Sequence, residues 1–132
     1  MPPAALIESL RRFFASRYGE VVCVYLFGSQ ARGTAAASSD VDVGVLYAAD
    51  PPETLAGMGL DLAADLEAAI GHRVDLVVLN RAPVDLIHRV LRDGVLVCER
   101  DRSQRIRFEV RARNEYFDLL PYLRQYRQPT GG

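Results

Sequence analysis

The chain has 132 residues, of which 49% are hydrophobic and 25% are charged, a composition typical of a globular protein with one core. No apolar stretch approaches the roughly 18 residues of a membrane helix, and the first residues lack the apolar segment of a secretory signal, so we expect a cytoplasmic protein with no membrane partner. A formal net charge of −1 argues against direct nucleic-acid binding. All 16 cationic residues are arginine, so any cationic contact to phosphate must come from arginine.

The first part of the chain predicts a helix followed by two strands. Residues 5–17 place apolar side chains at helical spacing and predict an amphipathic helix. The continuous apolar run at 21–27 is typical of a buried central strand. It stops at Gly28-Ser29, where a short helix-compatible segment follows. Alternating polar and apolar residues at 40–46 predict the second strand.

The rest of the chain continues the alternation of helices and strands. The pattern predicts a helix at about 53–70, a third strand at 74–79, a short helix from Pro83 to Asp93, a short edge strand at 94–99 and a long helix at about 101–126. In the long helix, Ile106, Val110, Phe117 and Leu120 mark one face, and Pro121 is expected to kink or interrupt it.

Together these elements predict an α/β (α+β) fold. We expect a mixed sheet of three or four strands flanked by helices, with a long C-terminal helix. The interpretation places a single domain at residues 1–128 and a flexible tail at 129–132.

A candidate phosphate site begins where the first strand ends. The small Gly28 lets the backbone approach a ligand closely, and a helix starting at Ser29 would present free N–H groups and the serine hydroxyl to an anion. Arg32 lies one helical turn further on and is a candidate phosphate contact, with a salt bridge on the helix surface as the other reading. A Gly-Ser pair is weak evidence by itself, so the interpretation depends on the acidic residues that follow.

Three aspartates form a candidate metal site. Asp40 and Asp42 are two residues apart on the predicted second strand, so their carboxylates project from one face. Two like charges there are costly unless a cation compensates, and Mg²⁺ prefers such oxygen ligands. Asp75 interrupts the apolar third strand and joins the pair if the two strands are adjacent, so that three carboxylates hold two metals. Two other interpretations stay open. Asp40 and Asp42 can be solvated acids in a turn before the strand, and Asp75 can face solvent at the start of its strand.

The joint pattern is Gly28-Ser29, ten residues, Asp40-x-Asp42 and then Asp75 on a later strand. It resembles the polymerase-β-type nucleotidyltransferase superfamily. The stretch FGSQARGTAAASSDVDVGVL at 27–46 is similar to the small MNT-type minimal nucleotidyltransferases. The likeness covers residues 21–79 and also the segment EYFDLLPYLRQY at 115–126.

The resemblance implies the polymerase-β-like core and assigns roles to the candidate residues. Asp40, Asp42 and Asp75 are implied to be catalytic residues and the ligands of two Mg²⁺ ions. Gly28 and Ser29 are implied to hold the triphosphate of ATP, and Arg32 is a candidate for pairing with phosphate oxygens.

MNT-type proteins of this size resemble the antitoxins of HEPN/MNT toxin–antitoxin pairs. The resemblance implies a Mg²⁺-dependent protein adenylyltransferase that moves AMP from ATP to a hydroxyl, a tyrosine, of a cognate HEPN ribonuclease toxin and so neutralises it. Larger members of the superfamily typically carry an added helical domain that shapes the acceptor site. We therefore expect another protein or a second copy to complete that site, in a hetero- or homo-oligomer.

Two other functions stay open from the sequence. One is a binding-only antitoxin that covers the active site of its partner without catalysis. The intact set of three aspartates argues against it, because a binding module does not need clustered carboxylates. The other is a stand-alone nucleotidyltransferase for a small molecule such as an aminoglycoside, which the missing acceptor domain disfavours.

Overall fold

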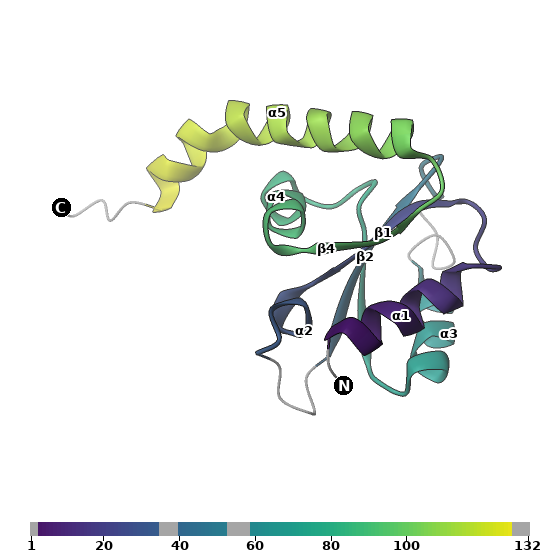
Figure 1. Ribbon diagram of the computed structural model, residues 1–132. Coiled ribbons are helices and arrows are strands. Elements are labelled where there is room, and N and C mark those ends of the chain that lie inside the picture. Colours follow the sequence, from purple (N-terminus) through teal and green to yellow (C-terminus); the bar gives the residue numbers. More distant parts are fainter. Residues whose placement is uncertain (1–2, 35–39, 53–58, 128–132) are drawn as a thin grey trace.

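The computed structural model describes residues 3–34, 40–52 and 59–127, and it contains a four-stranded sheet in the order β3-β2-β1-β4 (Figure 1). The strands are β1 (Val21–Phe27), β2 (Val41–Tyr47), β3 (Val74–Val78) and β4 (Val95–Glu99). β1 pairs antiparallel with β2 and with β4, whereas β2 and β3 are parallel. The prediction of a mixed sheet with the 21–27 strand at its centre and the last strand at an edge is therefore confirmed.

Helices cover both faces of the sheet. They are α1 (Pro3–Phe14), α2 (Gly28–Arg32), α3 (Leu60–Ile70), α4 (Val84–Asp93) and α5 (Arg102–Arg127). Apolar side chains of α1 and α3 pack on one face and those of α4 and α5 on the other, in two separate clusters. Six of the seven residues of β1 are buried because helices cover the strand on both sides and strands flank it on both edges. Among the described residues, no helix is both long and apolar enough to cross a membrane.

Most predicted boundaries agree with the structure to within one residue, and α1 is an exception. α1 ends at Phe14 rather than at residue 17. α5 continues through Pro121 to Arg127, so the expectation that Pro121 interrupts this helix is wrong. α3 is described from Leu60 onwards; the predicted helical residues 53–58 and the predicted tail at 129–132 lie outside the described residues.

α5 turns a different face to the sheet from the one its apolar pattern marks. Phe108 and Ala112 are buried, with 5% and 7% of their surface exposed, and they join the cluster under α4. Ile106, Val110 and Phe117 stay in contact with solvent. The helix therefore has two apolar faces, and only one of them contributes to the core.

A charged network fixes the start of α5 to the sheet. The Arg105 guanidinium forms ion pairs with Glu99 of β4 and, at 2.6 Å, with Glu109 one turn further along α5. The Tyr25 hydroxyl of β1 donates to the other oxygen of Glu109 at 3.1 Å. Because the Arg105 and Glu109 side chains are largely buried, losing either partner would leave an uncompensated charge.

Arg100 explains where α1 ends. Its guanidinium donates to the backbone carbonyls of Phe14, Arg17, Tyr18 and Val21, at the C-terminal end of α1 and in the turn that leads into β1. The last carbonyls of a helix have no partner within the helix, and a cation there also complements the helix dipole. A residue that follows β4 therefore closes the first helix of the chain.

We expect Arg100→Ala to lower the free energy of unfolding by about 1–3 kcal/mol, since several carbonyls lose a charged donor. The measurement is urea unfolding followed by circular dichroism. Arg102→Ala is the control, because this neighbouring side chain is exposed and makes no hydrogen bond or ion pair with the described residues. Equal urea midpoints for the two variants would contradict the capping role.

Candidate active site

The turn from β1 into α2 is built around a glycine that no other residue can replace without strain. Gly28 has a φ of +73°, a left-handed conformation that favours glycine. A Cβ atom at this position would lie 2.1 Å from Oδ2 of Asp42. The contact arises because Phe27, the last residue of β1, pairs with Asp42 on the antiparallel β2. Gly28 thus opens the space in which the Asp42 carboxylate lies.

Asp42 and Asp75 are direct neighbours across the parallel pair β2–β3. Asp42 is half-buried and Asp75 is exposed. Asp40, which is exposed, comes immediately before β2. The two acidic strands are adjacent, which is the condition under which Asp75 was expected to join the pair. Their pairing brings the carboxylates into one region at the start of both strands.

The electrostatics of Asp42 reflect this crowding. Burial raises the pKa of its carboxyl group, and the charges of Asp75 and Asp40 and a hydrogen bond with Asp75 raise the pKa further. The charge of Arg32 acts in the opposite direction and lowers it. Neighbouring carboxylates repel one another when they are ionised, and a bound cation would relieve that repulsion.

A cleft of about 490 Å³ lies beside Asp42 and Asp75. Of the predicted site residues, Gly28, Ser29, Arg32, Asp42 and Asp75 line it, and Asp40 does not. Ser29 lies in the first turn of α2, which ends at Gly33 in a left-handed conformation. The cleft therefore brings together the candidate phosphate residues and two of the three candidate metal ligands.

α4 supplies residues of the cleft that the sequence analysis missed. Leu86, Arg89 and Asp93 of α4 also line the cleft. Their spacing of three and four residues placed them on one helix face, but the pattern gave no indication that this face meets the cleft. Arg89 is exposed and has no hydrogen bond or ion pair within the described ranges. The cleft is thus lined by two arginines, Arg32 of α2 and Arg89 of α4.

The residues present fit a hard divalent cation. In the described part of the chain, no three His, Cys, Asp or Glu side chains form a group that could hold a metal ion by themselves. Mg²⁺ does not require such a cage, since it usually binds one or two carboxylates and keeps waters and substrate phosphates as its other ligands. The adjacent Asp42 and Asp75, beside arginines suited to phosphate, provide that incomplete set.

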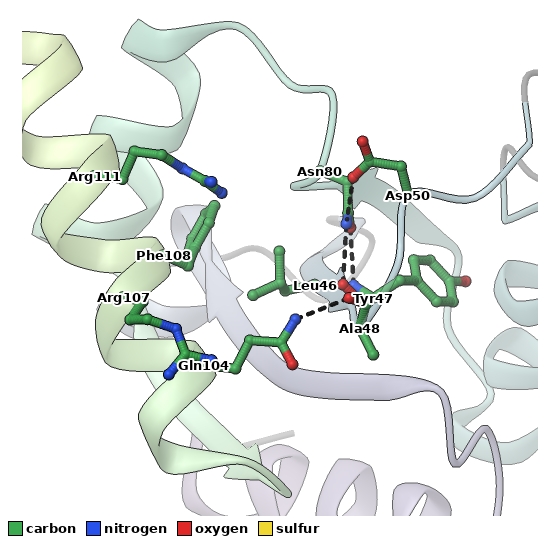
Figure 2. Close-up of a pocket in the computed structure, with 9 residues that line it drawn as sticks. All are labelled: Leu46, Tyr47, Ala48, Asp50, Asn80, Gln104, Arg107, Phe108 and Arg111. Carbon is green, nitrogen blue, oxygen red and sulfur yellow. Dashed lines mark hydrogen bonds between the residues drawn. The ribbon is translucent and has the colours of Figure 1, made fainter.

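A second pocket, of about 310 Å³, lies at the other end of β2 and contains none of the predicted site residues (Figure 2). Asn80 accepts from the backbone N–H of Tyr47 and donates to its carbonyl and to Asp50. Gln104 of α5 donates to the carbonyl of Ala48 at 2.9 Å. These bonds join the end of β2 to the loop after β3 and to α5, so Asn80 and Gln104 have a structural role.

Comparison with protein families matches residues 8–103 to polymerase beta, nucleotidyltransferase. The matched region includes all four strands and the cleft residues of α2 and α4. A curated relative, the protein adenylyltransferase MntA of Shewanella oneidensis, is 41% identical over 71 residues, which cover 54% of this chain and 49% of that protein. The chain therefore matches about half the length of this relative.

Two solved structures share the whole architecture. A toxin–antitoxin crystal structure with AMP-PNP gives a TM-score of 0.76 at 27% identity and covers 91% of this chain and 94% of the other. A tri-AMPylated HEPN toxin of Shewanella oneidensis in complex with an MNT antitoxin gives a TM-score of 0.71 at 22% identity, with 94% of each chain covered. The second likeness supports the fold alone. The mixed four-stranded sheet with its long C-terminal helix is thus the nucleotidyltransferase fold.

We expect Asp42→Asn to stabilise the metal-free fold at pH 7. Because the pKa of Asp42 is raised in the folded state, the ionised carboxylate destabilises the fold above that pKa. The penalty fades as the pH falls through the folded pKa toward the ordinary value of 3.8. The measurement is urea unfolding in EDTA between pH 7 and pH 4, with the exposed Asp118→Asn as the control. If Asp42→Asn raised the free energy of unfolding equally at every pH, or lowered it at pH 7, the electrostatic explanation would be wrong.

Proposed function

This chain belongs to the polymerase beta nucleotidyltransferase family, and from that premise we propose that it transfers AMP from ATP to a tyrosine hydroxyl of a HEPN-type toxin and acts as the antitoxin of that protein. The observation that carries the proposal is the Asp42–Asp75 pair beside the Gly28-Ser29 turn. This pair provides carboxylates for Mg²⁺ at the place where the turn and two arginines offer donors for phosphate.

The relatives support the choice of nucleotide and acceptor. MntA is a protein adenylyltransferase, and the structure with the highest TM-score reported above contains AMP-PNP, an ATP analogue. The AMPylated HEPN toxin of Shewanella oneidensis shows that a toxin can be the modified protein in such a pair. A tyrosine acceptor and two Mg²⁺ ions are our extension of that support to this chain.

The proposed reaction divides the cleft residues into three roles. The Ser29 hydroxyl and the backbone of the Gly28 turn hold the triphosphate, and Arg32 of α2 and Arg89 of α4 neutralise its oxygens. Asp42 and Asp75 of the cleft, with Asp40 just before β2, hold the cations near the phosphates, and Asp75 also receives the proton of the acceptor. Two Mg²⁺ ions, when bound, neutralise the developing phosphate charge and favour the ionised acceptor hydroxyl.

In the transfer step, the tyrosine oxygen of the acceptor forms a bond to the α-phosphorus. The bond between that phosphorus and the bridging oxygen of the β-phosphate breaks, so pyrophosphate leaves. Asp75, the most solvent-exposed carboxylate lining the cleft on β2 and β3, accepts the hydroxyl proton and releases it to water. The chain itself therefore supplies positioning, charge and a proton acceptor.

The direct test is transfer to the protein encoded by the neighbouring gene. We expect this protein to gain one or more AMP units when it is incubated with the chain, ATP and Mg²⁺, as measured by intact mass spectrometry. The Asp40→Asn/Asp42→Asn double variant should give no gain, because both carboxylates at the start of β2 are neutralised. A stable complex without any mass gain would reject the enzymatic proposal in favour of an antitoxin that acts by binding alone.

Arg89 provides a sharper test of the cleft. Arg89→Ala should raise the KM for ATP about 10-fold or more, the loss expected for a charge-assisted contact to phosphate. Arg107→Ala is the matched control, since this arginine is also exposed and unpaired within the described residues but lies on α5 outside the cleft. Steady-state kinetics that give the same KM for both variants would remove Arg89 from the nucleotide site.

A further inference from the structure

The outer face of α5 carries a regular row of side chains that the fold does not use. Six residues follow one another at spacings of four, three, four, three and four: Ile106, Val110, Arg113, Phe117, Leu120 and Arg124. This spacing keeps side chains on one side of a helix and is the pattern with which helices pack against one another in coiled coils. We call these six residues the outer seam.

Five of the six residues of the outer seam are exposed and Leu120 is half-buried, although the row is rich in apolar residues. Ile106, Val110 and Phe117 have exposed fractions of 43%, 50% and 65%. The buried residues Phe108 and Ala112 each follow a seam residue by two positions and so point to the opposite side of the helix. Contiguous exposed apolar surface of this kind is typical of an interaction site.

The distal part of α5 has little support from the rest of the protein. The Tyr116 ring stacks on His88 of α4, with ring centroids 3.5 Å apart. Beyond this contact, α5 runs past α4 (Figure 1), and within the described ranges no hydrogen bond, ion pair or ring contact joins residues 117–125 to another element. Isolated helices are marginally stable in water, so a partner that packs on this part would stabilise it.

Charge selects the kind of partner. α5 contains seven arginines and three acidic residues, a formal charge of +4, whereas the whole chain has −1. Within the outer seam the only charged residues are Arg113 and Arg124. A second copy of the chain would bring two such basic helices together, and like charges at an interface oppose association. A helix with acidic side chains complements the seam.

From these observations we infer that the outer seam of α5 binds an amphipathic helix of a different protein, with acidic side chains opposite Arg113 and Arg124. This identification of the partner as the protein acceptor rests on the proposed function. The contact is separate from the cleft, so it supplies affinity and orientation while the aspartates supply the chemistry. Helix-on-helix docking of this type takes its affinity from a few apolar anchors, and Phe117 is the largest in the row.

The test measures the Kd between the purified full chain and the protein encoded by the neighbouring gene, using isothermal titration calorimetry. The chain carries Asp40→Asn/Asp42→Asn, so that transfer cannot alter the complex. Phe117→Ser should raise the Kd about 30-fold or more, as expected for an interface anchor. Tyr122→Ser should change it less than about threefold, because Tyr122 is equally exposed, at 62% against 65%, but points to the other side of α5.

A charge reversal tests the acidic partner in the same way. Arg113→Glu should weaken binding strongly, whereas Arg111→Glu, two residues away on the other side of the helix, should have little effect. Both arginines are exposed, so circular dichroism should show folded variants. Equal effects of the seam variants and their controls on the Kd would overturn the inference. So would a chain with an unaltered seam that does not bind the partner. Self-association of the chain that Phe117→Ser abolishes would also overturn it.

Failure of this inference and failure of the proposed function give different results. If the seam variants weaken binding but the wild-type chain transfers no AMP, the docking surface stands and the enzymatic proposal fails. If the wild-type chain transfers AMP while seam variants bind as tightly as their controls, the reaction stands and the docking surface is wrong.

Discussion

The site depends on Gly28, because this residue has no side chain. A side chain there would occupy the position of the Asp42 carboxylate, 2.1 Å from Oδ2, because antiparallel pairing sets the end of β1 against the start of β2. The same glycine takes the left-handed conformation that starts α2 directly after the strand. The turn that starts α2 and the space for the Asp42 carboxylate are thus two consequences of a single close approach.

The rest of the sheet holds Gly28 close to Asp42, although this arrangement brings repelling carboxylates together. Parallel pairing of β2 with β3 sets Asp75 beside Asp42. Burial of Asp42, and then the charge of Asp75, raise the pKa of the Asp42 carboxyl group. The buried centre of the sheet, with helices packed on both faces, offsets the repulsion between the two carboxylates. In the proposed function, a cation and phosphates would relieve this repulsion, and charge that is pre-organised in this way lowers a reaction barrier.

Local features of the fold and the site were predictable because they leave a periodic signal. The apolar run of β1 and the Asp40-x-Asp42 alternation of β2 marked the two strands. The sequence let Asp75 join Asp42 only if their strands were adjacent, as the structure shows them to be. Long-range contacts were not predictable. α1 ends at Phe14 because Arg100, far along the chain, binds its carbonyls.

The same limit applies to faces of helices. α5 has two apolar faces, and periodicity marked the one with Ile106 and Val110, although the core uses the one with Phe108. Nothing in a single helix pattern says which face meets the sheet, because that depends on the elements packed against it. Arg89 was missed for the same reason, since only the packing of α4 beside α2 brings it to the cleft.

The most direct test of the central claim is a crystal structure of the chain with Mn²⁺ and AMP-PNP, with anomalous scattering to locate the metal. We predict a metal peak shared by Asp42 and Asp75, and a triphosphate that contacts Ser29 with Arg32 and Arg89 on either side. A metal or nucleotide bound elsewhere, or a cleft that stays empty at saturating ligand, would contradict the assignment of this cleft as the active site.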